Sequence, residues 1–134
     1  MKPLFTRTLT LLTLILSLVI SSAAQNSNSL NVIFKGTAAD TKTAIQSNSL
    51  SFQVSGLNTD QQVKDFVKRS QVYSKGFTMT VTPAADKNFQ QCKITFNGTP
   101  DVKWLQRFFM SSGIEEVELN GEKKNVNDFF KSIQ

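Results

Sequence analysis

The sequence predicts an α+β domain whose elements follow the order β-α-β-β-α-β. Three segments alternate apolar and polar residues, which is the pattern of half-buried strands, and they cover residues 50–54, 77–82 and 89–96. Two segments with helical character are each preceded by a glycine and a threonine, Gly56 with Thr59 and Gly98 with Thr99. This repeated passage from strand through glycine and threonine into helix predicts two similar halves that share one sheet.

The first 24 residues have the layout of a secretory signal peptide. Lys2 and Arg7 precede an apolar run at residues 9–20, and small residues up to Ala24 follow it. The run is shorter than the roughly 20 apolar residues that a transmembrane helix needs. We therefore expect cleavage after Ala24 and an exported protein, periplasmic or secreted, with no membrane attachment.

The composition excludes several classes of function. The chain has no histidine, so Ser-His-Asp and Cys-His catalytic sites and ordinary zinc sites are out of reach. Cys92 is the only cysteine, which rules out an intramolecular disulfide. Loss of Lys2 and Arg7 with the signal peptide lowers the formal charge from +5 to +3, and the remaining cations are scattered among acidic residues. We expect no nucleic-acid binding.

The segment before the β-α-β-β-α-β unit is less strongly patterned. Residues 30–35 alternate apolar and polar side chains and predict an additional N-terminal strand. Residues 37–48 are rich in Thr, Ala, Ser and Asn, and Ile45 is their only large apolar residue, so they predict a loop with room for a short helical turn. The expected organisation is a signal peptide at 1–24, an N-terminal strand and loop at 25–49, and a domain at 50–134.

The first helix of that domain has a clear start signal. Thr59 and Gln62 have the spacing of a capping box, in which each side chain bonds a backbone amide of the other residue. Val63 and Phe66 then recur at helical spacing toward the core, and the helix is predicted to end near residues 70–73.

The second helix and the C-terminal elements follow from similar signals. Thr99 is the expected cap, Pro100 the first helical residue and Gly113 the end of the helix. A strand near 114–119, a tight turn at Asn120-Gly121, a short added strand at 122–126 and a last helical turn begun by Asn127 and Asp128 complete the prediction. The polar side of each strand predicts an antiparallel sheet with helices on one face and water or a partner on the other.

This order is the ferredoxin-like arrangement of two interlocked βαβ units. Within it, residues 54–63 resemble the metal loop of heavy-metal-associated domains, whose pattern is Val-x-Gly-Met-x-Cys-x-x-Cys-Val; the matching residues are Val54, Gly56, Leu57 and Val63. Residues 113–119 are similar to the last helix-to-strand passage of the same family. The resemblance covers residues 50–119 and implies a ferredoxin-like fold.

The resemblance does not extend to the metal ligands. Thr59 and Gln62 occupy the positions of the family's two cysteines, whose thiolates bind soft cations such as copper(I). Because these two side chains offer only neutral oxygen and nitrogen, we expect no metal and no cofactor in this loop. Cys92 and Met79 form an alternative soft-metal site, although packing in the core is the favoured interpretation for both.

Two further groups of residues are candidates for function. Glu116 and Glu118 share one side of a strand and could act in a small carboxylate-dependent hydrolase, but solvated charges are the favoured interpretation because no pocket is implied. Trp104 and Phe108 belong to an apolar arc wider than one sheet contact needs, which makes them candidates for binding a partner. The alternative is that the N-terminal strand or the Phe129-Phe130 tail covers them.

Taken together, these features predict a non-catalytic binding or protein-interaction module. Its partner is a protein or a small ligand that the sequence does not name, and the sequence leaves the oligomeric state open. A residual carrier of soft metal ions is the alternative, and a hydrolase is a distant third.

Overall fold

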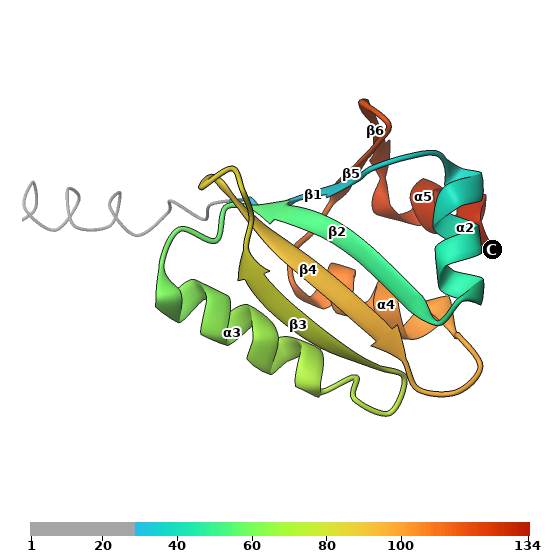
Figure 1. Ribbon diagram of the computed structural model, residues 1–134, viewed down its shortest axis with the longest axis horizontal. Helices are drawn as coiled ribbons and strands as arrows, with labels where there is room; N and C mark the ends of the chain where they lie inside the picture. Colours follow the sequence, from blue (N-terminus) through green and yellow to red (C-terminus); the bar gives the residue numbers. More distant parts are fainter. Residues whose placement is uncertain (1–28) are drawn as a thin grey trace, which may run out of the picture.

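The computed structural model describes residues 29–134, and the signal peptide predicted for residues 1–24 lies outside them. These residues form an α+β structure with one mixed six-stranded sheet and four helices (Figure 1). None of these helices is long and apolar enough to cross a membrane. The elements are β1 (Asn31–Phe34), α2 (Ala38–Gln46), β2 (Ser49–Ser55), α3 (Asp60–Gln71), β3 (Phe77–Pro83), β4 (Phe89–Phe96), α4 (Val102–Ser111), β5 (Glu116–Leu119), β6 (Glu122–Asn125) and α5 (Val126–Ile133).

The sheet has the strand order β3-β4-β2-β1-β5-β6. Every neighbouring pair is antiparallel except β1 and β5, which run in the same direction. The predicted antiparallel sheet with β1 as an addition is therefore wrong in one respect, because β1 lies inside the sheet. Its residues Val32 and Phe34 are almost completely buried, since they have a strand on each side and the helical layer above them.

The prediction of a loop at residues 37–48 is also wrong, because these residues form α2. The Thr37 hydroxyl accepts a hydrogen bond from the Asp40 amide, and Asp40 Oδ2 accepts from the Thr37 amide and hydroxyl at 2.8 Å each. These bonds hold the pKa of Asp40 below its ordinary value. Only Thr41 and Ile45 are buried, so the helix has too few apolar residues for periodicity to reveal it.

The capping box predicted for α3 is confirmed, whereas the starts of the other two helices are shifted. Asp101 rather than Thr99 caps α4, with its carboxylate accepting from the Lys103 amide at 2.9 Å. Asn125 rather than Asn127 or Asp128 caps α5, because the chain passes directly from β6 into that helix. In each case a side chain two or three residues from the predicted cap satisfies a free amide of the first turn.

A single aromatic core joins the sheet to the helices. Phe34 of β1 stacks on Phe129 of α5 with ring centroids 4.8 Å apart, and Phe109 of α4 meets Phe130 edge-on at 5.5 Å. The C-terminal helix is therefore part of the core and covers the C-terminal part of α4. Eight phenylalanines are fully buried: Phe34, Phe52, Phe66, Phe77, Phe108, Phe109, Phe129 and Phe130.

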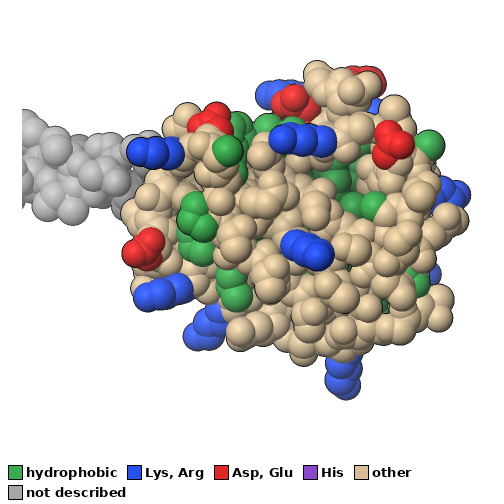
Figure 2. Space-filling view, in the orientation of Figure 1, with side chains coloured by type: hydrophobic (Ala, Val, Ile, Leu, Met, Phe, Trp, Pro, Cys, Tyr) green, Lys and Arg blue, Asp and Glu red, His purple; other side chains and the backbone are tan. Residues whose placement is uncertain are grey.

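The other face of the sheet is open and polar. Thr78 and Thr80 of β3, Lys93 and Thr95 of β4 and Ser51 of β2 are exposed there, while the alternate residues of β2 and β4 enter the core. Figure 2 shows this face as mostly uncharged side chains and backbone, with a few separate lysines. In Figure 1 the sheet lies in front of α4, so this is the face turned toward the viewer.

Candidate functional site

The loop that resembles a metal loop has a complete structural role. Gln62 Oε1 accepts from the amides of Asn58 at 2.7 Å and Thr59 at 3.0 Å, and the Thr59 hydroxyl accepts from the Gln62 amide at 3.2 Å. Gly56 precedes them with φ +93°, and a Cβ there would lie 3.0 Å from the carbonyl oxygen of Ser29. Glycine therefore lets the N-terminal segment pass against the turn, and Thr59 and Gln62 start α3.

Cys92 and Met79 lie on the core side of neighbouring strands. Cys92 is opposite Val81 and Met79 is opposite Ile94, so the two sulfurs belong to diagonal positions of β3 and β4. Burial raises the pKa of the Cys92 thiol to about 12. A thiol binds metal as the thiolate, which this environment disfavours. Within residues 29–134, no three His, Cys, Asp or Glu side chains are grouped so that they could hold a metal ion.

Phe108 has no exposed surface, so it cannot contact a partner of the folded protein. Phe66 and Phe77 pack on its ring at 5.1 and 5.8 Å. Trp104 is half-buried, with Tyr73 edge-on at 6.3 Å and the Arg107 guanidinium 5.7 Å from its ring. Residues at the end of α3 and the start of β3 therefore cover this end of α4, and Trp104 alone of the predicted pair retains a surface that a partner could reach.

Glu116 and Glu118 lie at the β5 end of the open face. Lys123 of β6 is directly opposite Glu118, and its Nζ lies 3.9 Å from Glu116 Oε2. The Glu116 side chain is 58% exposed. Exposed carboxylates beside a lysine have the environment of solvated surface charges rather than of a buried general acid.

The most developed cavity is a cleft at the other end of the contact between α3 and α4. It measures about 700 Å³ and lies between the β2–α3 turn, α3 and the α4–β5 turn. We call it the Ser112 cleft, and its lining includes Leu57, Asp65, Phe66, Arg69, Ser112, Glu115 and Glu116. Gly56 and Gln62 also line it, so the β2–α3 turn forms one wall of the cleft.

Ser112 distinguishes this cleft from an ordinary surface depression. The residue is only 6% exposed, and its Oγ is the one buried side-chain oxygen or nitrogen in residues 29–134 that has no hydrogen-bond partner. The preceding Ser111 hydroxyl, by contrast, donates to the carbonyl oxygen of Phe108 at 3.0 Å. An unsatisfied buried hydroxyl destabilises a protein by about 1–3 kcal/mol. Native structures contain few such groups, and backbone strain, a catalytic role or a bound water or ion accounts for those that occur.

The chemistry of the cleft is mixed. Leu57 and Phe66 supply apolar surface, while Asp65 and Glu115 outnumber the single lining cation, Arg69; the third lining carboxylate, Glu116, is paired with Lys123. In the described part of the chain, Arg69 forms no ion pair. The cleft can therefore accept a molecule that has an apolar part and a positive charge for the carboxylates, whereas Ser112 Oγ itself has less than 1 Å² of accessible surface.

The chain matches no protein-family model, no curated protein and no solved structure. No sequence pattern points to Ser112, whose one local signal is its place before Gly113 at the end of a predicted helix. Nothing in that signal separates Ser112 from Ser111. What separates them is which hydroxyl finds a partner in three dimensions.

Proposed function

We propose that this protein is a small, exported, non-catalytic binding module that holds a small ligand in the Ser112 cleft. The observation that carries the proposal is the buried Ser112 Oγ without a hydrogen-bond partner beside a cleft of about 700 Å³. Because Ser112 Oγ has less than 1 Å² of accessible surface, its side chain must turn toward the cleft to meet a ligand, and the new hydrogen bond would then satisfy the hydroxyl. Pockets of this size are typical of small-molecule sites.

We further propose that the scaffold is a ferredoxin-like domain of the heavy-metal-associated type that has lost its metal ligands. The order β2-α3-β3-β4-α4-β5 supports this, because β2 and β3 run in one direction with β4 between them, which makes a split βαβ unit. β4 and β5 form the second unit, with β1 inserted beside β2. In this proposal Thr59 and Gln62 stand at the positions of the family's two metal-binding cysteines and cap α3 instead.

The ligand class that fits best is an organic cation on a short apolar stem, such as a primary alkylamine. Leu57 and Phe66 would contact the stem, and the amine would lie near Asp65, Glu115 and Glu116. Because the chain as a whole is positively charged, this excess of carboxylates is local to the cleft. A binding role rather than catalysis is supported by the absence of histidine and by the exposure of all three carboxylates.

The test is an NMR titration of the purified protein with pentylamine, pentanol and pentanoate. We expect pentylamine to shift the amide signals of Gly56, Ser112 and Gly113 at millimolar concentration, pentanol to do so more weakly and pentanoate not at all. Ser112→Ala should weaken pentylamine binding about fivefold, because one hydrogen bond contributes roughly 0.5–1.5 kcal/mol. The matched control is Ser111→Ala, which should bind as the parent does.

Two results would contradict the proposal. In the first, pentylamine shifts no amide of the cleft at concentrations where the protein remains folded. In the second, Ser112→Ala and Ser111→Ala affect binding equally, which would make the hydroxyl irrelevant to the ligand.

A further inference from the structure

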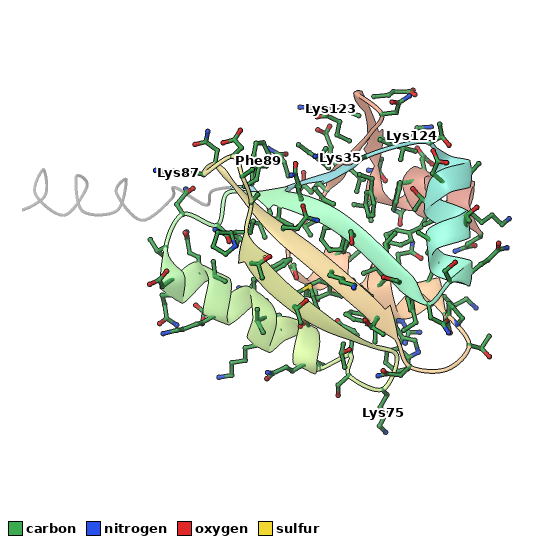
Figure 3. The ribbon with its side chains drawn as sticks, in the orientation of Figure 1. Lys35, Lys75, Lys87, Phe89, Lys123 and Lys124 are labelled. Carbon is green, nitrogen blue, oxygen red and sulfur yellow. The ribbon has the colours of Figure 1, made fainter. Side chains whose placement is uncertain are left out.

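The two edges of the sheet differ in how they are protected against other strands. β6 is short and carries Glu122, Lys123 and Lys124, and Figure 3 shows both lysines at that end of the molecule. β3 has seven residues and no charged side chain. Natural sheets usually protect an edge with charges, short strands, proline or a covering helix; the β3 edge has only Pro83 at its end and α3 packed beside it, so its backbone is less protected than that of β6.

The hydrogen bonds of the β3–β4 hairpin show which backbone groups of β3 face outward. The Ala84 amide donates to Phe89 O at 3.2 Å, and at the other end the Asn97 amide donates to Gly76 O at 3.1 Å. In an antiparallel pair, bonded positions recur every second residue. Thr78, Thr80 and Thr82 therefore direct their backbone groups toward β4, whereas Met79 and Val81 direct theirs away from the sheet.

These outward groups have no partner within residues 29–134. β4 is the only strand paired with β3, and no hydrogen bond reaches the outward amide or carbonyl of Met79 or Val81. The part of β3 whose outward backbone groups could pair with another strand is bounded at each end. The Phe77 amide already donates to Tyr73 O at 3.2 Å, and Pro83 has no amide hydrogen to offer.

We propose that the β3 edge binds the β3 edge of a second copy of this chain, antiparallel and about a two-fold axis at Thr80. In this register Met79 lies opposite Val81 of the second copy, and the outward amides and carbonyls of both residues form two pairs of backbone hydrogen bonds. Thr78 lies opposite Thr82 of the second copy. The Thr side chains thus meet on the open face, and the half-buried Met79 and Val81 meet on the core face.

The register explains why a second copy is the occupant. The segment from Thr78 to Thr82 alternates Thr with apolar residues symmetrically about Thr80. An antiparallel second copy therefore places threonine opposite threonine and an apolar residue opposite an apolar residue. A two-fold contact uses the same patch on both copies and closes after one step. The pairing would consume the less protected edge and leave the charged β6 strands at the two ends of the joined sheet.

The test is sedimentation of the exported protein over a range of concentrations, with Thr80→Glu as the disrupting variant. Within one chain Lys93 lies opposite position 80, so the new carboxylate has a favourable neighbour and the fold is retained. Across the two-fold axis the two carboxylates would meet and repel each other. We expect the dissociation constant of the dimer to rise about fivefold or more. The Thr80→Lys variant should also form a weaker dimer. An equal mixture of the two variants should form heterodimers, because opposite charges then meet at the axis.

The control is Thr95→Glu, which places the same charge on the exposed face of β4, one strand away from the edge. It should leave association unchanged. As an independent measure, Thr80→Cys should form a disulfide-linked dimer on oxidation, because directly opposite residues of this type have Cα atoms about 4.5 Å apart. Cys92 is buried and would not compete.

A protein that stays monomeric at every concentration would overturn the proposal. So would dimers that Thr95→Glu disrupts and Thr80→Glu does not, because the contact would then lie on the open face. Neither result bears on the Ser112 cleft, which β3 does not line.

Discussion

The contact between α3 and α4 is closed at one end and open at the other, and two adjacent serines mark the difference. At the closed end, Ser111 Oγ lies 3.0 Å from the Tyr73 hydroxyl and also bonds to Phe108 O. At the open end, Ser112 Oγ is buried without a partner beside the cleft. The same pair of helices thus carries an aromatic junction with a hydrogen-bonded serine and a cleft with an unsatisfied serine hydroxyl beside it.

Side-chain size accounts for this asymmetry. Tyr73 and Trp104 fill the closed end, and Gly76 makes room for the tryptophan, since a Cβ there would lie 2.5 Å from Trp104 Cγ. At the open end no side chain fills the turn at Gly113, where nothing lies within 4 Å of a Cβ position, whereas Ser29 and Leu30 pack against Gly56. The comparison indicates that aromatic residues stabilise the domain at one end, which allows the other end to keep a group that destabilises it.

We expect the largest loss of stability from Phe108→Ala, which removes a core residue of the closed end. Removing a fully buried phenylalanine leaves a cavity, and we expect the free energy of unfolding to fall by about 3–5 kcal/mol. Urea denaturation measures this change. Met110→Ala is the control, because Met110 is 57% exposed on the same helix and its loss should change stability by less than about 0.5 kcal/mol. Equal effects of the two variants would contradict the assignment of Phe108 to the core.

The next largest loss of stability should come from disturbing the contact between Gly76 and Trp104. Gly76→Ala should destabilise the protein by about 1–3 kcal/mol, because the new methyl group overlaps the indole. In a double-mutant cycle, Trp104→Ala should remove most of this penalty, since the two sites are in direct contact. Additive effects in thermal or urea unfolding would show that Gly76 is required for another reason.

The two serines should respond in opposite directions. Ser112→Ala removes an unsatisfied buried hydroxyl and should raise the free energy of unfolding by about 1 kcal/mol, whereas Ser111→Ala breaks a bonded pair and should lower it by a similar amount. Urea denaturation without ligand compares them directly. A clear loss of stability in Ser112→Ala would mean that the hydroxyl is already satisfied in the free protein.

The core that both ends share should show a pH dependence through Cys92. Burial raises the pKa of its thiol from 9.0 to about 12, so its contribution to stability is complete below pH 9 and is lost as the pH rises toward 12. We expect unfolding measurements between pH 9 and 11 to show a decline of at most about 1.4 kcal/mol per pH unit from this group. Cys92→Ala should lack that component, and an identical decline in both proteins would assign it to other groups.

Local signals were sufficient for much of the fold. The alternation in β2, β3 and β4 and the capping box at Thr59 and Gln62 predict the central elements, because side chains close in sequence produce them. α2 was missed because a Thr37 cap and two buried residues stabilise it without an apolar stripe. The position of β1 between β2 and β5 depends on contacts far apart in the chain, which no local pattern encodes.

The sequence by itself determined the order of the central elements, the capping box at Thr59 and Gln62 and the absence of histidine. Each of these depends on residue identity or on neighbours within a few positions. Only the tertiary structure decided that Phe108 is buried while Ser112 lines a cleft, and that the Met79 and Val81 backbones face outward at a sheet edge. Burial, hydrogen-bond satisfaction and strand order arise from packing between distant segments, so they become visible only when the chain is folded.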